Sequence, residues 1–296
     1  MKKKTRKAMG LALCAVLSFG MLTGCGKNTN SEDNKGASGE ISVVSREDGS
    51  GTRSAFVELT GVEEKDADGN KIDNTYEDAI VANSTEIVMT TVEGDENAIG
   101  YISLGSMGDS VKGLQVDGVD PTAENIINGT YTLSRPFNIV TNGEVSDVAQ
   151  DFINFIMSEE GQKVISDNGY IEVENSGAFT SNGASGKIVV AGSSSVTPVM
   201  EKLQEAYQAI NGGAEIEIQE SDSTTGVNFT ADGTCDIGMA SRDLSEEESG
   251  KGLTATAIAM DGIVTIVNNA NEITGLTKEQ INDVFRGNIT DWSELQ

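Results

Sequence analysis

The chain has 296 residues with a net charge of −27 at neutral pH, and its length is sufficient for about two globular domains. So acidic a surface repels nucleic acids and anionic lipids, and we expect neither as a partner. The sequence contains no histidine, which excludes Ser-His-Asp and Cys-His catalysis and histidine-ligated zinc, and we predict neither a cofactor nor a bound metal ion.

Residues 1–24 have the pattern of an export signal, with a basic start and an apolar run at 8–22 that is shorter than the roughly 20 residues of a membrane span. The sequence LTGC that ends at Cys25 resembles a bacterial lipobox, in which the cysteine becomes the lipid-modified N-terminus; a plain secretory signal is the alternative. Residues 25–40 are polar and rich in Gly, Ser and Asn, which predicts a flexible tether. We therefore expect a protein held by a lipid at the outer face of the cell membrane.

The stretch SREDGSGTR at 45–53 lies between a strand-like apolar run at 41–44 and a helix-like run at 55–59. Its glycines permit a tight turn that brings backbone N–H groups close to a ligand, and the following helix directs its positive dipole end to the same place. The pattern predicts an anion-binding loop, with a plain turn between strand and helix as the alternative.

Four side chains of this loop suit an oxyanion. Arg46 offers a planar, charged fork to a tetrahedral anion, and Asp48 is expected to hold that fork in position. Ser50 and Thr52 add hydroxyl groups that can donate hydrogen bonds.

Predicted strands and helices alternate along the rest of the chain, which indicates the α/β class. We expect a solvated surface loop at 61–74, and a buried Cys235 without a disulfide partner because Cys14 leaves with the signal and Cys25 is acylated. Strands are predicted at 98–105, 187–191, 215–219, 236–239 and 258–268, and helices at 84–92, 148–156, 199–210 and 277–285.

Nine segments together resemble the motif set of the bacterial phosphate-binding proteins that serve Pst-type ABC transporters. They are GSSSVTP, DSTTG, DIGMASRDL, AMDGIVTIVN, TKEQINDVFRGNITDW, SREDGSGTR, IGYISLG, LSRPFNIV and SEEGQK. Their order is rotated, because in the family GSSSVTP comes first and SEEGQK last. We therefore predict a circular permutant in which residues 172–186 join the ancestral termini. A fragment of a tandem array, completed by a second chain, is the alternative.

The resemblance implies a two-lobed, hinge-closing fold of the periplasmic-binding-protein type (type II), with the ligand in the cleft. In this order, residues 131–266 would form one lobe, and residues 41–130 plus 267–296 the other. Crossovers between the lobes are expected near 134–136 and 267–268.

The resemblance also implies the residues that contact phosphate, which are Arg46, Ser50, Gly51, Thr52, Ser194, Ser195, Ser223 and Thr224. Many members have an aspartate that accepts the proton of hydrogen phosphate, but Ser241 and Arg242 stand at that place in this chain. The proton acceptor is therefore open, with Asp261 as the first candidate and Asp243 as the second.

The predicted function is extracytoplasmic binding of inorganic phosphate by a monomer and its delivery to the permease subunits of an ABC transporter. A receptor for sulfate or a phosphonate and a phosphate sensor are the alternatives. A phosphatase that uses Ser50 or Asp48 as nucleophile is least favoured, because the sequence offers no histidine and no convincing metal cluster.

Overall fold

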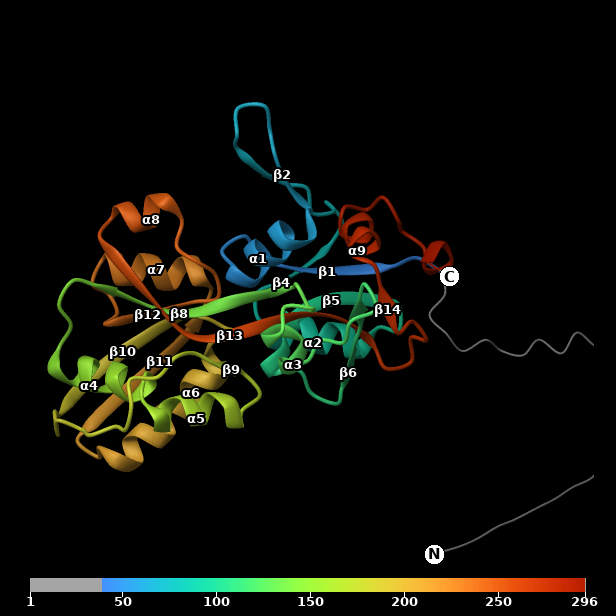
Figure 1. Ribbon diagram of the computed structural model, residues 1–296. Coiled ribbons are helices and arrows are strands. Elements are labelled where there is room, and N and C mark those ends of the chain that lie inside the picture. The colour runs from blue at the N-terminus through green and yellow to red at the C-terminus, as the bar shows by residue number, and fades with distance from the viewer. Residues whose placement is uncertain (1–38, 296) are drawn as a thin grey trace, which may run out of the picture. The chain divides into compact units, whose positions relative to one another are not determined.

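The structure is a computed structural model that describes residues 39–295 (Figure 1). The predictions for the export signal, for lipidation at Cys25 and for nearly all of the tether lie outside the described residues.

Within residues 39–295, a mixed sheet of ten strands runs through the molecule, as the α/β class requires. Along the sheet, the strands are β11 (Ala214–Ser221), β10 (Gly186–Ser193), β12 (Ile237–Ala240), β8 (Ser134–Asn142), β13 (Leu253–Asn268), β5 (Ala98–Ser103), β1 (Ser42–Arg46) and β4 (Ile80–Ala82). Two further strands, β6 (Val111–Gly113) and β9 (Ile171–Glu172), also pair with β13.

The long strand β13 joins the two halves of the sheet. Residues Leu253 to Gly262 pair antiparallel with β8, and residues Ile263 to Val267 pair with β5. The pairing partner of β13 therefore changes between Gly262 and Ile263, a few residues before the predicted crossover near 267–268. The domain limits themselves stay predictions.

One half of the sheet carries a hydrophobic core around Trp292, here called the Trp292 core. Helices α1 (Gly51–Thr60) and α9 (Lys278–Phe285) pack on one face of β1 and β5, and α2 (Thr85–Gly94) packs on the other. Alternation along the strands explains this division, because Val43 points to α1 and Val44 to α2. The ring of Phe56 stacks on Tyr101 with 3.9 Å between the centroids.

The other half carries a core around Tyr207, here called the Tyr207 core. Helices α4 (Asp147–Ile156), α5 (Glu159–Asp167) and α6 (Thr197–Ile210) pack against the strands of this half to form it. Helix α7 (Ser223–Ala231) covers the opposite face, where Val227 packs with Val140, Ala240 and Leu253 (Figure 1). Each half is thus a helix–sheet–helix sandwich.

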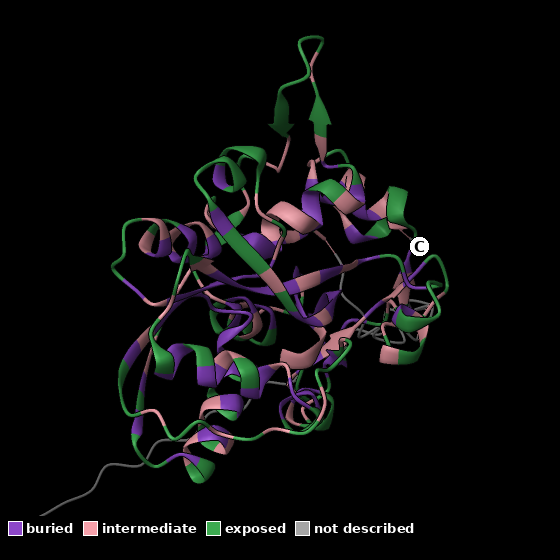
Figure 2. Cartoon of the chain, turned by 60° about the vertical axis from the view of Figure 1, so that its left-hand side comes forward, coloured by how far each residue is buried: buried purple, intermediate pink, exposed green. Residues whose placement is uncertain are grey.

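The polar segment predicted as a loop at 61–74 instead contains the hairpin of β2 (Glu63–Lys65) and β3 (Lys71–Asp73), which stands out from the molecule and is largely exposed (Figure 2). The Asp66 carboxylate stabilises its turn by accepting hydrogen bonds from the backbone of Asp68 and Asn70. Cys235 is buried, as predicted.

The remaining elements are short. They are η1 (Leu104–Ser106), β7 (Gln115–Val116), α3 (Ala123–Ile127), α8 (Glu246–Gly250), β14 (Gly275–Leu276) and η2 (Trp292–Leu295). In the part of the chain that the structure describes, no helix has both the length and the apolar character that crossing a membrane demands.

The aromatic contact beneath α1 makes a first prediction. Phe56 is fully buried against Tyr101 and Phe285, so Phe56→Ala should lower the free energy of unfolding by about 3–5 kcal/mol through the cavity it leaves. Urea unfolding measures the loss. Ile72→Ala, in the exposed hairpin, is the control and should change the free energy of unfolding by less than about 0.5 kcal/mol. Equal effects of the two substitutions would contradict this packing.

Candidate functional site

The site lies at the carboxyl ends of parallel strands from both halves of the sheet. Strands β1 and β4 are parallel in one half, and β10, β11 and β12 are parallel in the other. Helices α1, α2, α6 and α7 begin directly after four of these strands. In open α/β sheets, ligands bind at this edge, and the helix N-termini present positive dipole ends and free N–H groups there.

Hydroxyl groups from these strand ends form two hydrogen-bonded groups, here together called the hydroxyl cluster. Its members are Thr52, Thr85, Ser193, Ser194, Ser195, Ser223 and Ser241, all of them buried. The hydroxyl of Ser195 lies 2.8 Å from that of Thr52 and 3.0 Å from that of Thr85. These bonds join segments that are more than one hundred residues apart in sequence.

The second part of the cluster surrounds Ser241, whose hydroxyl lies 3.0 Å from that of Ser193 and 3.3 Å from that of Ser223. Gly51 brings the two parts together. A Cβ built on Gly51 would lie 2.4 Å from the Ser223 hydroxyl and 2.7 Å from the Ser241 hydroxyl, so a side chain has no room there. Gly51 therefore allows the backbone of the predicted loop to approach these two hydroxyls closely.

Arg46 places a cation at the cluster. Its guanidinium is buried and donates hydrogen bonds to the Ser194 hydroxyl at 3.0 Å and to the Thr85 hydroxyl at 3.4 Å. The carboxylate of Glu47 accepts two hydrogen bonds from the same guanidinium, at 2.7 and 2.8 Å. This bidentate geometry fixes the plane of the fork.

The prediction that Asp48 holds the Arg46 fork is wrong. The Asp48 side chain is 96% exposed and pairs with Arg53 at 2.7 Å. Arg53, in the first turn of α1, also donates to the carbonyl oxygen of Arg46 at 2.9 Å. Because Asp48 pairs with Arg53, Glu47 is the carboxylate that orients the Arg46 guanidinium. Ser50 is buried, and its hydroxyl accepts the Arg53 N–H as the N-cap of α1.

Several contacts of the candidate site were missed from the sequence, among them Ser193 of the hydroxyl cluster, Thr85 and Tyr101. Thr85 follows Ser84, the N-cap of α2. A hydroxyl group at the start of a helix was the sequence signal that could have identified Thr85. Tyr101 lies behind the loop, where its hydroxyl contacts the Ser45 hydroxyl at 2.9 Å and accepts the Arg46 N–H at 3.1 Å. Burial raises the pKa of Tyr101, so the phenol stays protonated at neutral pH.

Arg242 is turned toward α8 and makes no hydrogen bond to the hydroxyl cluster. Its guanidinium donates to both oxygens of Glu248, at 2.7 and 2.8 Å, and to the hydroxyl of Thr224 at 3.2 Å. Burial alone would raise the pKa of Glu248, but the hydrogen bonds from Arg242 and from the Ser245 backbone lower it to about 2. Of the predicted residues in this region, Ser223 and Ser241 join the cluster, and Arg242 and Thr224 lie beside it.

Asp261 is buried in β13 and is likewise occupied elsewhere. Its carboxylate accepts from the Arg135 guanidinium at 3.1 Å, from the Ser103 hydroxyl at 2.8 Å and from the Gly105 backbone at 3.4 Å. Burial raises the pKa of Asp261, although Arg135 acts against that rise. The structure thus places the first candidate for the proton acceptor at the junction of β13, β8 and β5, with no hydrogen bond between its carboxylate and the hydroxyl cluster.

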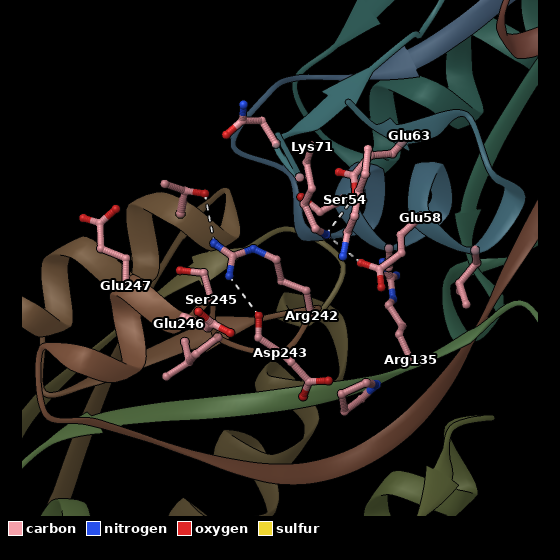
Figure 3. Close-up of a pocket in the computed structure, with 18 of the residues that line it drawn as sticks. Ser54, Glu58, Glu63, Lys71, Arg135, Arg242, Asp243, Ser245, Glu246 and Glu247 are labelled. Carbon is pink, nitrogen blue, oxygen red and sulfur yellow. Dashed lines mark hydrogen bonds and ion pairs between the residues drawn. The ribbon is translucent and has the colours of Figure 1, made fainter. Parts of the chain in front are cut away.

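A groove of about 1110 Å³ lies beside α1 (Figure 3). Glu58 and Lys71 line one side of it, and Arg242 and Glu247 line the other. Its lining mixes both signs of charge and includes no member of the hydroxyl cluster. Across residues 39–295, no three His, Cys, Asp or Glu side chains are arranged to hold a metal ion.

Comparisons with known proteins show what the chain is similar to. A family model described as a PBP superfamily domain matches residues 10–160 and 177–296. The phosphate-binding protein PstS 2 of Streptococcus agalactiae is 48% identical over 294 residues, which cover 99% of each chain. The protein of the same name from Streptococcus pneumoniae is 47% identical over 99% of this chain and 100% of its own.

A crystal structure of a phosphate-binding protein of a phosphate ABC transporter from S. pneumoniae is also similar. It superposes with a TM-score of 0.69 at 48% identity and covers 87% of this chain and 100% of its own. The phosphate-binding protein PstS of Bacillus subtilis is 32% identical over 150 residues, which are 50% of this chain and 47% of that protein.

The Arg242–Glu248 pair makes a prediction about pH. Because the pKa of Glu248 lies at about 2 in the folded chain, below its ordinary value of 4.5, the pair stabilises fully above pH 4.5 and loses its effect as the pH falls toward 2. Glu248→Gln should therefore lower the free energy of unfolding by roughly 1–3 kcal/mol at pH 7 and by progressively less below pH 4.5. Urea unfolding at pH 7, 5, 4 and 3 measures this. Glu247→Gln, at an exposed side chain, is the control. A difference that stays constant with pH would speak against the pairing.

Proposed function

The chain belongs to the PstS-type phosphate-binding proteins of the PBP superfamily, and on that basis we propose that it binds inorganic phosphate at the hydroxyl cluster and delivers it to an ABC transporter. One observation carries the proposal: the buried guanidinium of Arg46 and the buried hydroxyls meet where four helices begin. Because its relatives are named as phosphate-binding proteins, the chain is grouped with binding proteins and not with phosphatases.

The chemistry of the cluster suits a small oxyanion. Each serine or threonine hydroxyl can donate one hydrogen bond to a phosphate oxygen, and Arg46, oriented by Glu47, adds charged donors. Hydrogen bonds to a charged partner contribute about 1.5–3 kcal/mol each. Several of them therefore exceed the ~8 kcal/mol of a micromolar complex even after the costs of ordering and closure.

The proposed contacts are Arg46, Ser50, Gly51, Thr52, Thr85, Ser193, Ser194, Ser195, Ser223 and Ser241. Asp48, Thr224, Arg242 and Asp261 have other partners and are assigned supporting positions around the site. Hydroxyl oxygens also accept hydrogen bonds, so a serine of the cluster can accept the hydrogen bond that the P–OH group of hydrogen phosphate donates. A receptor for sulfate or a phosphonate is the alternative, and competition between phosphate and these anions separates the possibilities.

We further propose that the chain is a circular permutant with two lobes, residues 131–266 and residues 41–130 plus 267–296. The match to the streptococcal relatives runs the full length, whereas the match to the B. subtilis protein covers half of each chain, as a rotated order would produce. The hydroxyl cluster draws on both parts of a single chain, which supports a complete site in a monomer over a fragment of a tandem array.

A substrate-binding protein of an ABC transporter works outside the cytoplasm, and we propose a lipid at Cys25 as the anchor, with residues 25–40 as the tether to the permease. The lipobox-like LTGC sequence supports this. A phosphate sensor on the same fold is the alternative role.

Replacement of Arg46 tests the binding site. Arg46→Ala removes the charged donors and leaves the Glu47 carboxylate unpaired beside the ligand, so phosphate affinity should fall at least tenfold. Calorimetric titration of the mature chain measures both affinity and stoichiometry. Arg286→Ala, which loses a surface pair with Glu64, is the matched control and should bind as the unaltered chain does.

Two outcomes of this titration would change the proposal. Unchanged affinity in Arg46→Ala would remove Arg46 from the site. Binding confined to a dimer fraction, in place of about one phosphate per monomer, would favour the tandem-fragment alternative.

Replacement of Cys25 tests the anchor. In bacterial cells, Cys25→Ala should move the protein from the membrane fraction to the medium, because the residue that would carry the lipid is absent. Fractionation and immunoblotting measure the distribution, with Ser31→Ala as a control in the same segment. Retention of Cys25→Ala in the membrane fraction would rule out this anchor.

A further inference from the structure

We propose that Gly49 and the start of α7 form a clasp that closes the phosphate site, with Gly49 as a positioning residue that does not itself contact the ligand. The proposal rests on the proposed function, because it concerns closure around the same anion. The clasp consists of one backbone hydrogen bond and one close approach, both between the loop after β1 and the residues 222–224.

The hydrogen bond runs from the backbone N–H of Thr224 to the carbonyl oxygen of Gly49, at 3.1 Å. Gly49 lies in the loop that leads into α1 and the Trp292 core, whereas Thr224 lies in the first turn of α7, on the sheet half that carries the Tyr207 core. The bond therefore joins parts of the chain that belong to different cores.

The close approach explains why residue 49 is a glycine. A Cβ built on Gly49 would lie 2.3 Å from Oδ1 and 2.6 Å from Cγ of Asp222, distances that real Cβ atoms do not adopt. The φ angle of Gly49 is not in the left-handed region, so its backbone conformation is open to any residue. The contact with Asp222, and not backbone strain, excludes a side chain.

Asp222 cannot swing aside at low cost. Its carboxylate is the N-cap of α7, with Oδ1 accepting the Thr225 N–H at 2.8 Å and Oδ2 accepting the Thr225 hydroxyl at 2.6 Å. Moving the carboxylate would break both bonds and expose an unsatisfied helix N-terminus. A methyl group at residue 49 must therefore push the loop and α7 apart.

Separation at this point would open the site, because the same two segments carry its donors. Arg46 and Thr52 flank Gly49 in the loop, and Ser223 lies between Asp222 and Thr224. Gly51 already fits against the hydroxyls of Ser223 and Ser241 with no room for a Cβ. The position of Gly49 thus sets how closely the donors of the two halves can surround one anion.

The experiment compares Gly49→Ala with Gly94→Ala, a glycine at the end of α2 where an added Cβ meets open space. Calorimetry and stopped-flow dissociation with inorganic phosphate should show at least tenfold weaker binding and faster dissociation for Gly49→Ala, and neither change for Gly94→Ala. Adding Asp222→Gly to Gly49→Ala should restore at least part of the affinity, because glycine removes the obstructing carboxylate and is tolerated as an N-cap.

A second measurement reports closure directly. Spin labels at residues 58 and 247, on opposite sides of the groove in Figure 3, should lie farther apart in Gly49→Ala than in the unaltered chain. Affinity and label distance that both match the unaltered chain would overturn the clasp. If the unaltered chain binds no phosphate, the proposed function fails, and the label distances alone decide whether Gly49 controls closure.

Discussion

The buried guanidinium of Arg46 is the interaction on which the arrangement of the site depends. A charge removed from water costs several kcal/mol unless partners surround it, so its contacts with Glu47, Thr85 and Ser194 are required as a set. Glu47 belongs to the same loop, whereas Ser194 comes from the other half of the sheet. The bond between Arg46 and Ser194 therefore also joins the two halves of the sheet. In the proposed site, an oxyanion would replace the Ser194 hydroxyl as the acceptor of that bond.

The topology supplies this arrangement without regard to where the chain begins. Strands β1 and β10 each end in a loop rich in Ser, Thr or Gly that leads into a helix, and β13 crosses between the two cores. An edge formed by the carboxyl ends of parallel strands stays in place when the chain termini move, because strand direction and pairing are unchanged. A rotated order of segments is for this reason compatible with an intact site, and the full-length likeness to the streptococcal proteins is compatible with it as well.

Local features of the site could be predicted from the sequence, and long-range pairings could not. The loop at 45–53 and the turn before α6 were recognisable because glycine, hydroxyl and helix-start residues act within a few positions. The partner of Arg46 was predicted incorrectly because Arg53 competes for Asp48, which depends on side-chain direction in the first turn of α1. Tyr101 was missed because β5 comes more than fifty residues after the loop that Tyr101 contacts. The partners of Asp261 could not be predicted because they depend on where β13 changes its pairing from β8 to β5. The hairpin β2–β3 was not predicted, because its strands are three residues long and largely exposed.

The large negative charge of the chain and the capture of an anion are compatible because they act over different distances. Repulsion from the acidic surface is screened over about 8 Å at physiological salt, whereas hydroxyl and guanidinium donors act at contact. Within the site, Glu47 offsets the charge of Arg46 beyond contact distance, so the attraction for an anion comes from the Arg46 donors at contact, from oriented N–H and O–H dipoles and from the four helix N-termini. Such dipoles do not attract an anion from afar, and they act only when the donors surround it closely. In the proposed site, affinity therefore depends on how closely the donors surround the anion, and Gly49 and Gly51 allow the close approach of the two halves that this needs.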